Sequence, residues 1–242
     1  MSAFPFSPAP VQVFESGDAA LRVVATSGDA ERDWSTVHHL AEWLEACGAE
    51  GLHGAVPTYD SVLVEFDVLA VSAQQVRAFV GLGLRQLALS ADDDAAPREF
   101  DVPVVYGGAY GPDLEAVAQH EGLSVEEIIR LHSSKTYVIR CLGAPAGSPM
   151  MDGPAFPLPV PRLKDPRLSV PAGAVSVAGR QAVIAPAVAP GGWQVIGQTP
   201  LTLLDIHRDP LVPYNPGDIL RFRQITEDEF ADYAGQMMEA GR

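Results

Sequence analysis

The sequence predicts an α+β protein with two domains, an α/β sandwich followed by a β-barrel. Two observations support this prediction. Apolar residues follow helical spacing between strands in the first 90 residues, whereas the second half contains many short strands separated by Pro and Gly. A polar connector over residues 90–97 lies between these two halves, and 242 residues are enough for two cores of ordinary domain size.

The first half predicts a small α/β sandwich over residues 11–90, with its elements in the order β-β-α-β-α. Apolar residues of its first helix recur with helical spacing, and Ser72 is the expected N-cap of its second helix. Residues 1–10 are rich in Pro and Ser and are expected to be flexible. The predicted elements are strands within Val11–Ala25 and over Val62–Phe66, and helices over Ala30–Ala46 and Ala73–Leu84.

Residues 98–230 predict two short helices and a closed or nearly closed β-barrel. The first helix begins at Pro112-Asp113, and the second begins at Ser124, where Glu127 completes a capping box. Residues 231–242 are expected to form a C-terminal tail. The predicted strands are Val102–Tyr106, Tyr137–Ile139, Val175–Val177, Ala182–Ile184, Trp193–Ile196, Leu201–Leu204 and Ile219–Phe222.

Charge and composition argue against several function classes. The chain has 31 acidic and 16 basic residues and a formal net charge of −15, which repels phosphate backbones and anionic lipid. We therefore expect no nucleic-acid or membrane partner. The N-terminus lacks a signal-peptide pattern, and Cys47 and Cys141, the only cysteines, form no Cys/His cluster. These features predict a cytoplasmic protein with reduced thiols and no bound metal.

Several motifs in the second half are more specific than strand or helix propensity. They include VVYGG at 104–108, YGPDL at 110–114, PRLKDPR at 161–167, AGRQ at 178–181 and PGGWQVIGQTP at 190–200. In this order and spacing the chain resembles the family variously called the 5-oxoprolinase B subunit, allophanate hydrolase subunit 1 and the inhibitor of a sporulation sensor kinase. The resemblance covers nearly the whole chain.

The resemblance implies a ferredoxin-like N-terminal domain and a cyclophilin-like C-terminal barrel. It also implies a homologous carboxyltransferase-like partner of the C-subunit type and, in the enzyme, a third protein of the A-subunit type. Together these proteins open a small molecule, 5-oxoproline, to glutamate at the expense of ATP. ATP is therefore expected to be used by the complex, although no ATP site can be placed in this chain. Neither a metal nor biotin is expected.

The chain departs from the family pattern where a pocket wall is expected. Ala144, Ser148 and Met150 stand where the family typically carries two Phe and a Tyr, and Ala185 stands in place of another Tyr. An aromatic side chain can bury roughly 150–250 Å², so these changes remove much contact surface. An enlarged pocket bounded by these four residues beside Arg162 is the expected result.

No catalytic residue can be assigned, but the motifs contain candidates for substrate binding. The guanidinium forks of Arg162 and Arg167 could hold a carboxylate or phosphate, or could pair with the acidic surface of the protein. Gln181 could present its amide to a substrate carbonyl or carboxylate, or could cap the end of a strand.

Further candidates are His132 and the Gly191-Gly192-Trp193 turn. His132 could move a proton, or it could have a structural role at the C-terminus of a helix. The two glycines allow backbone conformations closed to other residues and could shape an anion-binding turn or a simple hairpin. Trp193 could belong to the core or to a ligand platform.

Three functions are consistent with these features. The first is a subunit of an ATP-dependent, ring-opening hydrolase of the 5-oxoprolinase type. The second is a divergent member whose enlarged pocket takes a bulkier cyclic amide or carboxylated substrate. The third is a non-catalytic, cyclophilin-like inhibitor of a sensor histidine kinase.

Overall fold

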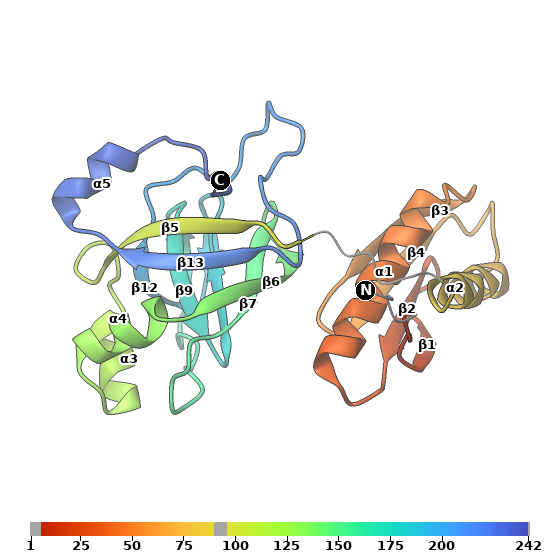
Figure 1. Ribbon diagram of the computed structural model, residues 1–242, viewed down its shortest axis with the longest axis horizontal. Coiled ribbons are helices and arrows are strands. Elements are labelled where there is room, and N and C mark those ends of the chain that lie inside the picture. The colour runs from red at the N-terminus through yellow and green to blue at the C-terminus, as the bar shows by residue number, and fades with distance from the viewer. Residues whose placement is uncertain (1–5, 90–95, 242) are drawn as a thin grey trace. The chain divides into compact units, whose positions relative to one another are not determined.

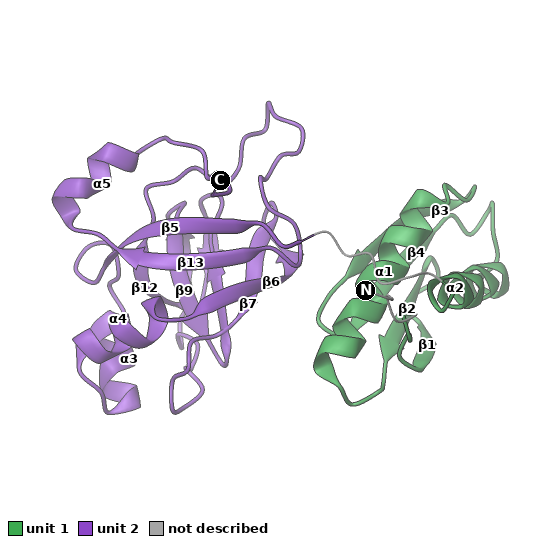
Figure 2. Cartoon of the chain, viewed as in Figure 1, with its two compact units in different colours: residues 1–95 green, residues 96–242 purple. Residues whose placement is uncertain are grey.

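The structure, a computed structural model, describes residues 6–89 and 96–241. It divides into two units, unit 1 (residues 1–95) and unit 2 (residues 96–242), each with its own apolar core (Figures 1 and 2). Most of the expected connector, residues 90–95, lies outside the described part of the chain. The two units are therefore described separately.

Unit 1 is a four-stranded antiparallel sheet packed against two helices (Figure 1). The strand order is β1-β2-β4-β3, and the helices contact each other as well as the sheet. Buried residues alternate along β2 and β4, so that one face of the sheet joins both helices in a single core. The elements are β1 (Val11–Glu15), β2 (Ala20–Ala25), α1 (Ala30–Ala46), β3 (Leu52–Pro57), β4 (Ser61–Phe66) and α2 (Ala73–Leu87).

The strand β3 was not predicted, so the observed order is β-β-α-β-β-α rather than β-β-α-β-α. Gly51, Gly54 and Pro57 indicated a break in regular structure at this place. In the structure β3 pairs with β4 through an irregularity between Leu52 and Gly54, which accommodates the glycines within the strand.

Residues 6–10, the described part of the segment over residues 1–10, make contacts with α1. The backbone N–H of Ala9 donates to Thr36 Oγ1 at 2.8 Å, and Ala9 is buried. Arg32 also donates to the carbonyl oxygens of Ser7 and Pro8, at 3.0 and 2.9 Å. This segment is therefore fixed against α1.

Local sequence explains where the helices begin. Ser72 caps α2 and forms a capping box with Gln75, so the predicted N-cap is confirmed. The predicted capping box of Ser124 and Glu127 is confirmed at the start of α4. Asp29 caps α1 by accepting two backbone N–H groups, both at 3.0 Å.

Unit 2 is a closed seven-stranded barrel with the strand order β10-β7-β6-β13-β5-β12-β9. β5 and β13 are parallel, whereas the other paired strands of the barrel are antiparallel. The barrel strands are β5 (Glu99–Tyr106), β6 (Thr136–Gly143), β7 (Ser148–Asp152), β9 (Ala174–Ala178), β10 (Gln181–Ile184), β12 (Gln194–Gln198) and β13 (Ile219–Gln224). The predicted closed barrel is thus confirmed.

Three helices and a short two-stranded sheet accompany the barrel. α3 and α4 lie beside each other and contact β12 and β13 (Figure 1). The elements are α3 (Leu114–Glu121), α4 (Val125–Ser133), α5 (Glu227–Tyr233), and the paired strands β8 (Arg167–Val170) and β11 (Ala189–Gly191). Neither β7 nor this short sheet was predicted, because Pro and Gly interrupt their apolar patterns.

One further expectation for unit 2 is wrong. Leu201–Leu204 is not a strand, because Thr202 makes only an isolated bridge to Met237. Within the predicted C-terminal tail, Met238 is fully buried, its N–H donates to Thr202 O at 2.9 Å, and the N–H of Gly241 donates to Glu99 O at 2.7 Å. The C-terminal segment therefore belongs to the barrel unit.

Candidate functional site

The structure brings Arg162 and Trp193 together on the outside of the barrel. The guanidinium carbon of Arg162 lies 5.7 Å from the centre of the Trp193 ring, within the range of a cation–π contact. Arg162 is exposed and Trp193 is half-buried. The guanidinium is therefore held over one aromatic face while its N–H groups stay accessible. We call these two residues the Arg162–Trp193 surface.

Backbone contacts on both sides fix this surface. The N–H of Leu163 donates to Gly192 O at 2.8 Å, which places Arg162 beside the residue preceding Trp193. The Gln194 amide donates to Pro161 O at 3.0 Å. The loop that carries Arg162 is thus attached to the start of β12 at two points.

Arg167 has a different position from Arg162, although it belongs to the same motif. Its Nη1 and Nη2 atoms donate to Asp113 Oδ2 and Oδ1 at 2.8 and 2.7 Å. These hydrogen bonds raise the pKa of the Arg167 guanidinium. Asp113 is buried and also accepts the N–H of Val195 at 2.7 Å. Arg167 is therefore a structural clamp that joins β8 to α3 and β12.

Sequence reasoning missed the role of Asp113. It correctly placed Asp113 at the start of a helix, where the residue is the N-cap of α3. Its side chain makes no capping hydrogen bond, however, and binds Arg167 instead. The only signal in the sequence was an acidic residue in YGPDL and an arginine without an assigned role in PRLKDPR. Helix and strand propensities cannot show that these two side chains bind each other.

His132 is a fully buried residue of α4. Its Nδ1 atom lies 2.7 Å from Tyr106 Oη, and the ring of Phe222 packs 4.5 Å from its own. Burial lowers the pKa of His132 to about 3, so the ring is neutral at pH 7. Its Nε2 atom has no hydrogen-bond partner among the described residues. This environment supports a structural role for His132. The buried ring is neutral, whereas a histidine that interacts with the C-terminus of a helix is normally protonated.

Gly191 and Gly192 do not need unusual backbone conformations. Neither residue has a positive φ, so neither adopts the left-handed backbone conformation that only glycine enters easily. A larger residue at position 191 would be crowded, because its Cβ atom would lie 3.0 Å from Val170 Cγ2. At Gly192 the nearest atoms would be at an ordinary 3.5 Å.

Gln181 begins β10 and pairs with Ala178 and Asp152 of the neighbouring strands. Lys135 belongs to the same neighbourhood, since its Nζ donates to Gly153 O at 2.7 Å and lies 4.7 Å from the centre of the Tyr137 ring. Burial lowers the pKa of Lys135. Lys135 is thus attached to the barrel through its ammonium group.

The four positions of the altered pocket wall lie along β7 and just beyond β10. Ala144 is exposed in the turn before β7, Ser148 is buried at the first residue of β7, and Met150 pairs with Val183 of β10. Ala185 follows β10 and packs against a small buried cluster that includes Val195. Continuing the strand register places Ser148 opposite Ala185.

The loop that carries Arg162 approaches the other end of β10. Val160, two residues before Arg162, pairs with Gly179, which places the loop near Gln181. Gln181 pairs with Asp152, and Ser148 lies four residues from Asp152 along β7. Four strand residues span about 13 Å. Strand register thus places Ser148 towards the opposite end of β7 from this loop, and an enlarged pocket beside Arg162 stays a prediction.

The glycine-rich turn after β5 is fixed by its own backbone and by β12. The carbonyl oxygen of Gly107 accepts the N–H groups of Tyr110 and Gly111, at 3.1 and 2.8 Å. A Cβ atom on Gly111 would lie 2.1 Å from Ile196 O, so glycine is required for close packing there.

The described residues contain no group of three or more His, Cys, Asp or Glu side chains arranged to hold a metal ion. No helix within residues 6–89 or 96–241 is long and apolar enough to cross a membrane.

Comparisons with known proteins decide the family. A family model described as the carboxyltransferase domain, subdomain C and D, matches residues 11–214. The 5-oxoprolinase B subunit of Bacillus subtilis (strain 168) is 34% identical over 232 residues, covering 92% of this chain and 96% of that protein. The chain belongs to the 5-oxoprolinase B-subunit family. Membership of a B-subunit family implies a complex with other subunits.

Solved structures share the fold of this chain. The crystal structure of TTHA0988 has a TM-score of 0.73 and 31% identity over 86% of this chain. This chain spans 40% of the length of TTHA0988. The Kluyveromyces lactis urea carboxylase has a TM-score of 0.76 and 17% identity, covering 96% of this chain and 24% of that one, which shows a shared fold.

Proposed function

We propose that this chain is one component of an ATP-dependent hydrolase that opens 5-oxoproline to glutamate. It acts there with a homologous carboxyltransferase-like subunit in the cytoplasm, where ATP is available. The observation that carries the proposal is the exposed Arg162 guanidinium held over Trp193, within motifs shared with the 5-oxoprolinase B-subunit family.

The proposed role of Arg162 is to hold the carboxylate of the substrate. 5-Oxoproline carries one carboxylate beside the lactam that must be opened, and a guanidinium can donate two parallel hydrogen bonds to a carboxylate. Stacking on Trp193 fixes the plane of the guanidinium before the substrate binds, which lowers the cost of ordering it. Local charge supports this role, because PRLKDPR at 161–167 has three basic residues and one acid in a chain of net charge −15.

The proposal assigns this chain to substrate binding and leaves the reacting groups and the ATP site to the complex. Water must attack the lactam carbonyl while the ring nitrogen leaves with a proton, and the described residues offer no motif for that step. Within the proposal, unit 1 is ferredoxin-like and unit 2 is cyclophilin-like. The antiparallel sheet with two helices and the closed seven-stranded barrel support these two assignments.

The test is ATP-dependent release of glutamate from 5-oxoproline by this chain co-purified with its neighbouring subunits. Arg162→Ala is expected to reduce kcat/KM by at least about 100-fold, since removing a charged hydrogen-bonding partner typically costs about 3 kcal/mol. The matched control is Arg130→Ala, which removes another exposed Arg of unit 2 and is expected to change nothing. An intact wild-type complex without activity would overturn the proposal and direct attention to bulkier substrates or a regulatory role.

A further inference from the structure

A groove runs between the two helices of unit 1, which contains none of the residues used in the proposed substrate site. It has a volume of about 510 Å³ and is mainly apolar. Trp43 and Cys47 contribute from the α1 side, one helical turn apart, and Gln75, Phe79 and Leu82 contribute from α2. The three α2 residues follow the i, i+4, i+7 spacing of a single helix face. We call this feature the α1–α2 groove.

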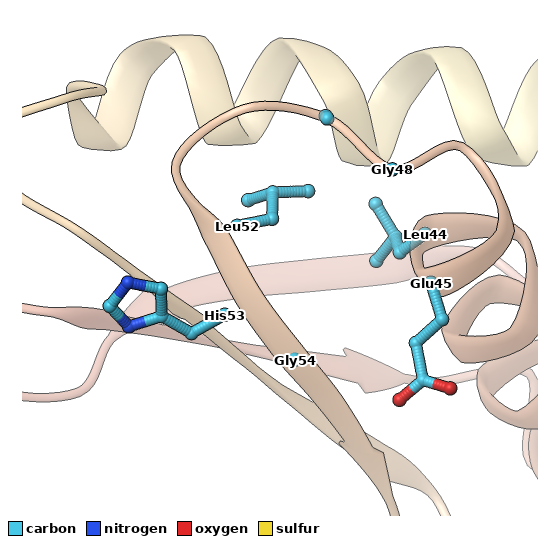
Figure 3. A pocket seen from close by; sticks show the side chains of 7 residues that line it. Leu44, Glu45, Gly48, Leu52, His53 and Gly54 are labelled. Carbon is cyan, nitrogen blue, oxygen red and sulfur yellow. The ribbon is translucent and has the colours of Figure 1, made fainter.

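The apolar surface continues around the groove. Leu82 is 38% exposed, and the loop that borders the groove at Ala70 also presents Val68 at 50% and Leu69 at 93% exposure. A second hollow, of about 260 Å³, shares Ala49 with the groove. There Leu44 and Leu52 lie next to the turn after α1, between Glu45 and His53 (Figure 3). Exposed apolar side chains such as Leu69 and Val68 beside an apolar groove favour a site for a protein partner.

The charge around the groove defines the partner further. Unit 1 contains 14 acidic residues and four basic residues. Glu50 lines the groove, and Glu42 and Glu45 are exposed on α1 on either side of Trp43 in the sequence. None of these three carboxylates has an ion-pair partner among the described residues. The four Arg residues of unit 1 lie outside the groove lining. A complementary surface is therefore apolar and flanked by basic side chains.

We propose that the α1–α2 groove binds an amphipathic, basic helix of the carboxyltransferase-like partner subunit. The inference rests on the proposed function for the existence of that subunit. The α2 residues that line the groove span about 10 Å along their helix, which is enough to contact two turns of a partner helix. A second copy of this chain is a poor occupant, because its net charge is −15 and the acidic borders of two grooves would repel each other.

Cys47 provides a direct test, because it is an exposed free thiol in the groove. Burial raises the pKa of Cys141, the other cysteine, to about 11, so Cys141 is a slow internal reference. Iodoacetamide is added to the free chain and to the co-purified complex, and alkylation of each cysteine is followed by peptide mass spectrometry. We expect the complex to slow alkylation of Cys47 by at least about tenfold.

A matched pair of variants provides a second test. Leu82→Glu places a charge in the groove and is expected to reduce the affinity for the partner by at least about tenfold. Val56→Glu is the control, since Val56 is 50% exposed and does not line the groove. Circular dichroism of both variants establishes that they are folded. Raising the salt concentration is expected to weaken the wild-type complex, because basic and acidic groups attract across its border.

The outcomes distinguish a failure of the groove inference from a failure of the proposed function. A complex that releases glutamate but leaves Cys47 fully reactive and tolerates Leu82→Glu would overturn the groove inference and leave the proposed function standing. A Cys47 that is protected by self-association of the free chain would also overturn it, in favour of a second copy. Failure of the neighbouring subunits to bind or to release glutamate would overturn the proposed function and, with it, the occupant assigned to the groove.

Discussion

The two arginines of the motif at 161–167 show how one segment can serve two purposes. Arg167 donates two hydrogen bonds to the buried Asp113, whereas Arg162 lies exposed over Trp193. A positive charge in a motif therefore does not by itself identify a binding residue. The presence of a buried acceptor decides which arginine is structural.

Asp113→Ala is expected to give the largest loss of stability. It leaves Arg167 without its carboxylate and removes the acceptor of the Val195 N–H, for a loss of about 3 kcal/mol in the free energy of unfolding. The loss is not larger because the Arg167 side chain is 32% exposed, so solvent screens part of its attraction to Asp113. Urea unfolding measures it. The double variant Asp113→Ala, Arg167→Ala is expected to lose clearly less than the sum of the single variants. Additive losses would contradict a clamp.

The buried His132 predicts a pH dependence of stability. Burial lowers its pKa from the ordinary 6.5 to about 3, so between these values the unfolded chain binds a proton that the folded chain does not. Its contribution is complete above pH 6.5 and falls as the pH drops towards 3. We expect a loss of about 2 kcal/mol between pH 7 and pH 5. His132→Gln should reduce this dependence and the exposed control His53→Gln should not; an unchanged slope in His132→Gln would contradict a neutral, buried His132.

The two glycines before Trp193 are expected to differ in how much stability is lost when each is replaced by alanine. Gly191→Ala would bring a Cβ atom to 3.0 Å from Val170 Cγ2 and is expected to cost about 1 kcal/mol of stability. Gly192→Ala meets only ordinary contacts and is expected to stay within about 0.5 kcal/mol of wild type. Thermal unfolding of the two variants compares them. A large loss for Gly192→Ala would show that the loop beside Arg162 needs a glycine after all.

Arg162→Ala is expected to have only a small effect on stability, within about 1 kcal/mol, because an exposed cation–π contact contributes little. Asp113→Ala should therefore be the more destabilising of the two by urea unfolding. If Arg162→Ala were as destabilising as Asp113→Ala, the distinction between a structural and an accessible arginine would be lost.

The sequence predicted the elements whose signals are local. Apolar spacing and caps located α1, α2 and α4, and regular punctuation by Pro and Gly predicted the barrel. Prediction failed for two different reasons. Glycines concealed β3 even though its partner β4 follows it directly in the chain, because a strand that contains glycines gives a weak local signal. Residues 231–241 are held by Thr202 and Glu99, which are distant in the sequence.

The candidate site was predictable only in part. The motifs indicated Arg162 and Trp193, which the structure brings into contact. They gave no means of distinguishing Arg167, whose acceptor Asp113 lies 54 residues away. The enlarged pocket wall stays a prediction, because the family pattern suggested it and strand register alone places only Ser148 opposite Ala185 and Met150 opposite Val183.

The central claim is that Arg162 holds the substrate carboxylate, and a substrate analogue tests it most directly. Binding of 5-oxoproline and of 2-pyrrolidinone, which has the same lactam ring without the carboxylate, is measured by calorimetry with the wild-type and Arg162→Ala complexes. We predict that the wild-type complex prefers 5-oxoproline by at least about tenfold and that Arg162→Ala removes this preference, while 2-pyrrolidinone binds both complexes equally. An undiminished preference for 5-oxoproline in the Arg162→Ala complex would contradict the account.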